Sequence, residues 1–575
     1  MFGATWERER VEGSYMPHHS QYSHTAMETP AASAVLAGNS AALRVLHVSE
    51  LVDIIFNFSN CSDNARYARV CKTWSTISLK IIWEEVDDLV ALFSILSPMF
   101  AGNKPEHHNV YVPSTAAWRR FETYANLVRK LVYTPTYPSK KRIARAVLRD
   151  IGQTRIRLDI FPNMHHLIWI PALHDSITSS ITPIPTDGYL FMHAGVKHVE
   201  FFLHKSVAPS RTKHFLDDIP LRAPLLTGLR IRGTTGVSAI EESIRRLAAS
   251  LTSLQNISLP EGYLTTRIAE ALSALPVLRR IQIGVDADDL PLDLREQPAN
   301  FAPVIPAGRF TALEKLEVSI VFSDAVKVLD KVTSENGLRH LSVESQSSSC
   351  EDMQRVLDIC AQKHKNLREL LLSGNADILA PNTPLTLQTI HSVKDLSALR
   401  VLNIEHTSAI FLSPADLSSI LSSLPRLVEL VLNDSPWYCE IASFGLDVIP
   451  VIAGSCRELI KLALFLDATI PLPDADSYPT EVAFAKLMQL HLGTSVITKE
   501  ACHDVALYLS AHIPAKCGIW YGASWIELED VVREGPHGER IRTAKERVNL
   551  WEEVESLVLF AEKVRIQERG RVEVS

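Results

Sequence analysis

One hydrophobic pattern recurs along most of the chain: an apolar residue, two others, an apolar residue, one other, and a final apolar residue. Successive clear copies start between 24 and 35 residues apart. Because the last two apolar positions are separated by one residue, they point to one side of a short strand. Looser copies lie at 128–133, 164–169, 196–201 and 226–231. The nine clear copies begin at Leu254, Leu278, Leu313, Leu338, Leu367, Leu399, Leu427, Leu459 and Leu487.

Amphipathic stretches with helical spacing separate these predicted strands, for example at 240–251, 267–275, 352–364 and 414–424. A helix of this length returns the chain so that the next strand runs parallel to the last. One such unit cannot bury its apolar face alone, whereas stacked units share a continuous core. We therefore predict an α/β fold in which 91–522 form a solenoid with a parallel sheet.

The repeated pattern resembles the LxxLxL part of leucine-rich repeats. The Asn or Cys that usually follows two residues later is mostly absent, so the resemblance implies irregular repeats. Beyond the repeats, 523–575 contain a loop and an amphipathic helix at 544–567, which we expect to cap the last repeat. Residues 1–42 have no hydrophobic period and are predicted to be a disordered leader.

The segment at 43–90 differs from the repeats, because its apolar residues recur at helical intervals. Leu46-His-Val-Ser-Glu-Leu-Val-Asp-Ile54-Ile55, followed by Val70-Cys71-Lys-Thr-Trp74, resembles an F-box. Phrases at 82–92, 505–509 and 551–554 are similar to those of F-box proteins with leucine-rich-type repeats from mushroom-forming fungi. Where that family usually has Leu-Pro, this chain has His47-Val48.

The resemblance implies the substrate-recognition subunit of a Skp–cullin–F-box ubiquitin ligase. In that arrangement the helical module binds a Skp-family adaptor, and through it a cullin, while the repeats bind a protein substrate. By analogy with the family, the adaptor contacts are Leu46, Leu51, Ile54, Ile55, Val70, Cys71 and Trp74.

A physical argument supports a partner independently of the resemblance. About 45 residues without disulfides or metal rarely supply a sufficient core, and this segment has more apolar residues than two or three helices can bury among themselves. They must therefore pack on the repeats or on another protein's helices. The alternative is a non-ligase repeat scaffold in which these residues form the core of a cap.

The outward-facing residues of the repeat strands are the predicted substrate surface. Among them Leu371, Val431 and Phe465 would form an exposed apolar stripe, a feature that usually marks a contact site. In the alternative arrangement the C-terminal helix lies over them. The predicted substrate contacts are Leu371, Asn403, Val431, Phe465 and His491.

Sequence motifs of catalysis are missing. We find no nucleophile elbow, zinc-protease helix, phosphate loop or dinucleotide turn, so we expect no enzymatic activity, no cofactor and no metal. The basic run at 140–142, continued by Arg145 and Arg149, is typical of a solvated helix face, with a phosphate-binding patch or a nuclear import signal as the alternatives.

Composition restricts the partners and the compartment. A net charge of −8 and a pI near 6.2 argue against general nucleic-acid binding. No apolar run reaches the roughly 18 to 20 residues of a membrane helix, and the N-terminus lacks the pattern of a secretory signal. The eight cysteines show no disulfide framework. We therefore expect a chain that does not enter membranes and that acts in the cytoplasm or nucleus.

Overall fold

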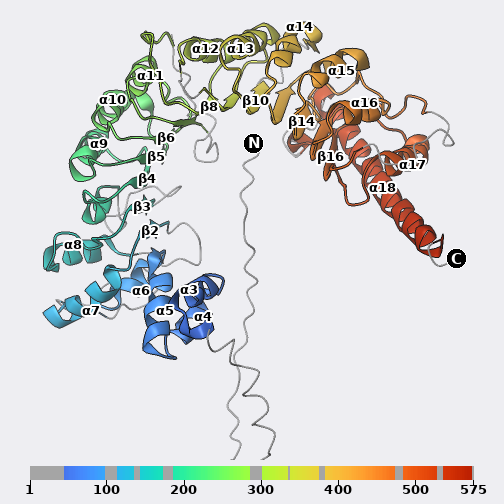
Figure 1. The fold of residues 1–575 in the computed structure, drawn as a ribbon. Coiled ribbons are helices and arrows are strands. Elements are labelled where there is room, and N and C mark those ends of the chain that lie inside the picture. Colours follow the sequence, from blue (N-terminus) through green and yellow to red (C-terminus); the bar gives the residue numbers. More distant parts are fainter. Residues whose placement is uncertain are drawn as a thin grey trace, which may run out of the picture. The chain divides into compact units, whose positions relative to one another are not determined.

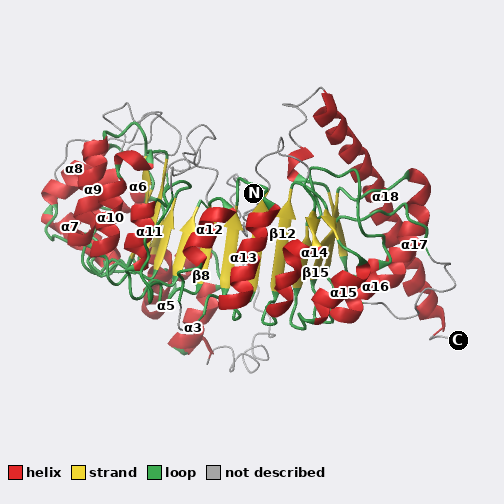
Figure 2. Ribbon diagram, turned by 90° about the horizontal axis from the view of Figure 1, so that it is seen from above, coloured by secondary structure: helices red, strands yellow, loops and turns green. Residues whose placement is uncertain are grey.

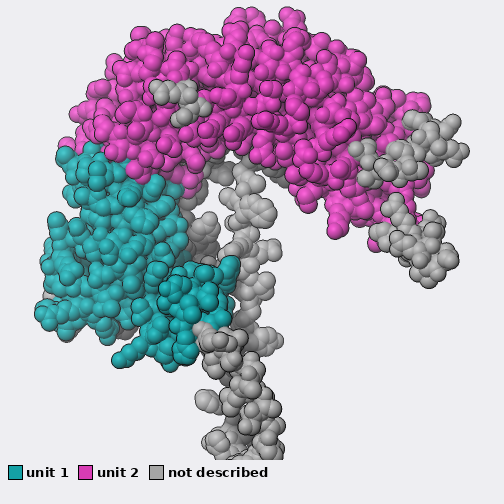
Figure 3. Space-filling model, in the orientation of Figure 1, with its two compact units in different colours: residues 1–211, 218–226 teal, residues 212–217, 227–575 magenta. Residues whose placement is uncertain are grey.

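The computed structural model describes residues 45–97, 113–134, 143–171, 185–284, 301–333, 337–374, 383–472, 484–526 and 535–572. The predicted leader at 1–42 and the basic run at 140–142 lie outside these ranges. The chain forms two compact units (Figure 3). The first comprises 1–211 with 218–226, and the second comprises 212–217 with 227–575.

The first unit begins with three short helices, α3 (Ser49–Asn57), α4 (Cys61–Tyr67) and α5 (Lys72–Glu84), which pack on one another. We call these three helices the helical module. The Asn60 side chain caps α4 by accepting a hydrogen bond from the Asp63 amide at 2.9 Å. Buried Asn64 ties α4 to α3, because its Nδ2 donates to the Phe56 carbonyl at 3.0 Å.

Strands follow the helical module without a break. The two-residue strand β1 (Glu85–Val86) continues from α5 and pairs with β2 (Lys130–Tyr133), followed by β3 (His166–Trp169) and β4 (His198–Leu203), all parallel. β1 is too short to carry the repeated pattern, so the sequence did not reveal it. Between these strands lie α6 (Leu89–Phe93), α7 (Thr115–Ala125), α8 (Arg145–Thr154) and the 3-10 helix η1 (Pro185–Phe191).

The second unit continues the same architecture (Figure 1). Each strand lies beside the next strand of the repeat series, and all neighbours within the unit are parallel. The strands are β5 (Gly228–Gly233), β6 (Asn256–Leu259), β7 (Arg280–Ile283), β8 (Lys315–Ser319), β9 (His340–Glu344), β10 (Glu369–Gly374), β12 (Val401–His406), β14 (Glu429–Leu432), β15 (Lys461–Leu464), β16 (Gln489–Gly493) and β17 (Gly518–Tyr521).

Helices connect these strands and lie along one face of the sheet (Figure 2). Shorter elements also occur, including the paired strands β11 (Leu385–Thr386) and β13 (Ile410–Phe411). The connecting helices are α9 (Pro209–Arg222), α10 (Glu241–Ser250), α11 (Thr266–Ser273), α12 (Phe322–Leu329), α13 (Cys350–Lys363), α14 (Leu387–Ile390), α15 (Pro414–Ser422), α16 (Val448–Ser455) and α17 (Cys502–His512). A further helix, α18 (Gly535–Val572), follows the last strand.

The strand register explains why the repeated pattern predicts this fold. In each of the nine copies, the last two apolar residues lie on a strand and are buried under the helices. Equivalent residues stand side by side, as in Ile281↔Leu316 and Leu316↔Leu341. Each strand therefore buries its apolar side chains against those of its neighbours. The predicted α/β solenoid with a parallel sheet is confirmed.

The last helix, α18, closes the C-terminal end of the second unit. It packs against α17 and β17 and begins nine residues earlier than the predicted 544. Its Trp551 is fully buried, and the indole Nε1 donates to the Ser495 carbonyl at 3.0 Å. α18 thus supplies the apolar cover that an outer repeat lacks.

Candidate functional site

The helical module exposes one face of α3. Leu51, Ile54, Ile55 and Phe58 follow one another at the spacing of a single helical face, and they are 40%, 54%, 42% and 89% exposed. The opposite face carries Val52 and Phe56, which are buried. The module's own core therefore uses one side of α3 and leaves the other side apolar and exposed.

Further exposed side chains belong to the same module. Val70, between α4 and α5, is 61% exposed, and Val48 at the start of α3 is 41% exposed. Cys71 is an exposed free thiol at the N-cap of α5. We call Val48, Leu51, Ile54, Ile55, Phe58 and Val70 the apolar face of the module. Sequence reasoning missed Val48 and Phe58, although Phe58 continues the spacing of 51, 54 and 55.

Trp74 and Leu46 behave differently from the other predicted adaptor contacts. Trp74 is half-buried and packs edge-on against Phe56 and Tyr67, with ring centroids 5.2 Å and 6.0 Å away. Its Nε1 donates to the Leu46 carbonyl at 3.4 Å, and Leu46 is itself half-buried. These two residues help to hold the module together, as the alternative interpretation of the predicted contacts expected.

The predicted substrate contacts on the strands lie in one row across the sheet of the second unit. The register connects Leu371↔Asn403, Asn403↔Val431, Val431↔Ala463 and Ala463↔His491. Alternate residues of a strand share a side, so this row lies on the face opposite the buried residues of the repeats. At its C-terminal end, His491 stacks on Trp520 of β17 at 5.7 Å, and Trp520 is 55% exposed.

The prediction of an exposed apolar stripe formed by Leu371, Val431 and Phe465 is wrong. Phe465 directly follows β15 and lies two residues beyond Ala463 of the row. Leu371 is half-buried, but Val431 and Phe465 are only 6% and 5% exposed. Phe465 forms a core with Ala409 and Cys439, against which Trp525 packs. Segments that follow the strands therefore cover Phe465. The sequence analysis considered only the C-terminal helix, α18, as a cover.

Towards β7, β8 and β9, the same face of the sheet carries polar and charged side chains. Lys315 Nζ lies 2.7 Å from Glu317 Oε1, and His340 Nε2 lies 2.9 Å from the same oxygen. Partial burial alone raises the pKa of Glu317, but hydrogen bonds from His340, Lys315 and Gln282 outweigh burial and lower the pKa to about 2. In contrast, burial and nearby Lys461 lower the pKa of His491 to about 4, so its ring is neutral at pH 7.

One carboxyl group beyond β14 makes a stability prediction possible. Burial and the charge of Glu405 raise the pKa of Asp434 to about 6. The folded state therefore binds this proton more tightly than the unfolded state, and the resulting stabilisation is complete below about pH 4 and lost as the pH rises through 6. The wild type loses this stabilisation between pH 4 and pH 7.5, whereas Asp434→Asn does not. We therefore expect the free energy of unfolding of Asp434→Asn, relative to that of the wild type, to rise by about 1–2 kcal/mol over this range, measured by urea unfolding at both pH values. An equal free-energy difference at the two pH values would contradict the shifted pKa.

The described residues show neither a metal cluster nor a membrane-crossing helix. Among them, no three His, Cys, Asp or Glu side chains come together as potential metal ligands. No helix in the described ranges has the length and apolar character needed to cross a membrane. Of the three His-His pairs in the sequence, only His165-His166 is described, and there burial and His198 lower the pKa of His166 to about 4.

The decisive observation for the fold is that each copy of the repeated pattern forms one strand, in sequence order, beside the strand of the next copy. The fold is a leucine-rich-type repeat solenoid. No model of a known protein family matches the sequence, and no curated protein sequence matches it.

Similar solved structures include several proteins with low sequence identity. A leucine-rich repeat-containing protein, LegL7 from Legionella pneumophila, has a TM-score of 0.28 at 13% identity, over 62% of this chain and 89% of its own. The mouse RP105/MD-1 complex has a TM-score of 0.29 at 12% identity, over 58% of this chain and 55% of the matched chain. The TLR13-ssRNA13 complex has a TM-score of 0.31 at 11% identity, over 66% of this chain and 56% of the matched chain. At these scores the fold assignment rests on the strand ladder of this chain.

Proposed function

We propose that this chain is the substrate-recognition subunit of a Skp–cullin–F-box ubiquitin ligase. The helical module docks the Skp-family adaptor, which connects the chain to a cullin. The partly exposed residues of the strand row in the second unit, Leu371, Asn403 and His491, bind a protein substrate. The chain itself performs no catalysis, and it acts in the cytoplasm or nucleus.

The observation that carries the proposal is the apolar face of the module. Three large side chains on α3, Phe58 at its C-cap and Val70 are exposed, while the opposite side of α3 already packs on α4 and α5. Large exposed apolar side chains grouped on one small module usually mark a site of protein association. A partner helix lying across α3 would remove these side chains from water.

The competing function is a repeat scaffold whose N-terminal helices only cap the array. Two contacts favour a capping role: β1 pairs with β2, and the Arg129 amide donates to the Glu84 carbonyl at 2.8 Å. Capping explains the attachment of α5 to the first strand. It does not explain why α3 keeps a full apolar side directed away from the module's core.

Reconstitution from purified components tests the proposal. The full chain is mixed with a Skp-family adaptor alone and with the adaptor bound to a cullin, and each mixture is run on a sizing column with light scattering. We expect a 1:1 complex with the adaptor, and a larger complex when the cullin is present. If the chain elutes alone at micromolar concentrations of both partners, the scaffold function replaces the ligase function.

A further inference from the structure

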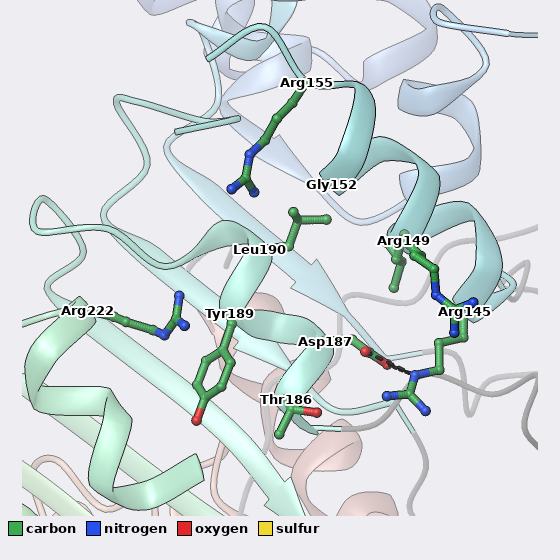
Figure 4. Close-up of a pocket in the computed structure, with 10 residues that line it drawn as sticks. Arg145, Arg149, Gly152, Arg155, Thr186, Asp187, Tyr189, Leu190 and Arg222 are labelled. Carbon is green, nitrogen blue, oxygen red and sulfur yellow. Dashed lines mark hydrogen bonds and ion pairs between the residues drawn. The ribbon is translucent and has the colours of Figure 1, made fainter. Parts of the chain in front are cut away.

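A pocket of about 310 Å³ lies in the first unit, between α8, η1 and the C-terminal end of α9 (Figure 4). Arg145 and Arg149 line it from one face of α8, and Arg155 lines it from the residue that follows this helix. Arg222, the last residue of α9, lines it from another side. Four guanidinium groups from separate parts of the chain therefore surround one small cavity.

The charge of this pocket is only partly balanced. Asp187 is the one acidic residue in the lining, and its carboxylate pairs with Arg145 at 3.0 Å. Among the described residues, no carboxylate lies within ion-pair distance of Arg149, Arg155 or Arg222. Four arginines and one aspartate leave three positive charges around the cavity. Such charges repel one another, so an anion that enters between them gains energy from each.

The pocket is also held in shape. The Arg222 guanidinium lies over the Tyr189 ring, 4.1 Å from its centroid. Gly152 brings α8 close to η1, because a Cβ at this position would lie 3.2 Å from Leu190 Cδ1. Figure 4 shows Arg155 and Arg222 near Leu190 and Tyr189, with the Arg145–Asp187 pair on the other side. Arg145 and Arg222, which these contacts hold in place, lose little freedom when a ligand binds, and this favours affinity.

From this geometry we propose that the pocket binds a small anion carrying two or more phosphate groups. A guanidinium donates paired hydrogen bonds to phosphate oxygens, and three guanidinium groups without a carboxylate partner in the described ranges exceed what a single phosphate needs. The volume is at the lower end of pockets that hold small molecules. The site does not depend on the ligase function, because none of its residues belongs to the helical module or to the row of strand residues.

The phosphates can belong to a soluble molecule or to a lipid headgroup. Leu221 and Leu225, which flank Arg222 in sequence, are 80% and 59% exposed, and such side chains insert into a lipid surface. The two sources present the same chemistry to the arginines. Vesicles therefore distinguish them, as a separate arm of the same experiment.

The experiment is calorimetric titration of the full chain with inorganic tripolyphosphate in 150 mM salt. We expect saturable binding, weakened about tenfold by Arg149→Gln and by Arg222→Gln, since each removes charge-assisted hydrogen bonds. Arg119→Gln is the matched control, because Arg119 is an exposed arginine of the same unit outside the pocket, and it should change the affinity less than twofold. Circular dichroism confirms that each variant is folded.

In the second arm, vesicles containing a headgroup-phosphorylated lipid are compared with phosphatidylserine vesicles of equal charge. Binding to the first alone, lost in Arg222→Gln, assigns the phosphates to a lipid; tripolyphosphate binding without vesicle binding assigns them to a soluble anion. The proposal is overturned if tripolyphosphate gives no saturable heat, or if Arg119→Gln weakens binding as much as Arg149→Gln. It is also overturned if a phosphorylated peptide binds and tripolyphosphate does not.

Discussion

Replacing Ile54 and Val70 together by glutamine is expected to lower the affinity for the Skp-family adaptor by roughly 1000-fold. Buried anchors at the centre of an interface typically contribute about 2 kcal/mol or more each, and two such losses multiply in the dissociation constant. Both side chains are more than half exposed in the free chain. The substitution should therefore leave the helical module folded, and surface plasmon resonance with the purified adaptor measures the effect.

The matched control is Leu158→Gln, which changes another exposed apolar residue of the first unit, 76% exposed and outside the module. It should leave the adaptor affinity unchanged. Trp74→Ala is unsuitable for this test, because it removes a ring that packs on Phe56 and Tyr67 and so weakens the module itself. If the Ile54 and Val70 double variant binds the adaptor as tightly as the wild type, the apolar face is not the docking surface.

The second large effect concerns the C-terminal cap. Trp551→Ala should lower the free energy of unfolding of the last repeats by about 3–5 kcal/mol, because it leaves a large cavity in a fully buried site. It also leaves the Ser495 carbonyl without the indole donor. Since each repeat contacts mainly its neighbours, the damage should stay local. Hydrogen–deuterium exchange should rise in β16, β17 and α17 and stay unchanged in α7 and α8.

Phe560→Ala is the control on the same helix, because Phe560 is 66% exposed and its loss opens no cavity. Its effect on stability should lie within about 0.5 kcal/mol. Equal exchange in the Trp551→Ala variant and the wild type would mean that α18 does not stabilise the repeats it covers. Faster exchange throughout both units would contradict the local character of the packing.

The strand ladder could be predicted from the sequence because its signal is local. Within each copy, two apolar residues alternate with one outward residue, and this is enough to define a strand and its buried side. Leu370 and Leu372, for example, are buried in β10, while Leu371 between them is partly exposed.

Whether residues on the opposite side of the sheet are exposed or covered could not be predicted, because residues far away in sequence decide it. Phe465 has the alternation of an outward residue, yet Cys439 and Trp525 pack over it. The pocket arginines pose the same difficulty: Arg145 and Arg149 are close in sequence, but Arg222 joins them only through the packing of η1 and α9. In the helical module, the sequence motif indicated that Trp74 contacts a partner. Only the fold shows that Trp74 packs edge-on against Phe56 and Tyr67.

The ordered pairing of each strand with its sequence neighbours also bears on how such a protein evolves. A gene duplication that copies one whole strand–helix unit inserts a new strand between two old ones, and the strands on either side find equivalent hydrogen-bonding partners. Each insertion would lengthen the row of outward residues by about 4.8 Å. Lineages can therefore change the reach of this surface by whole units, while the helices at the two ends keep their own packing.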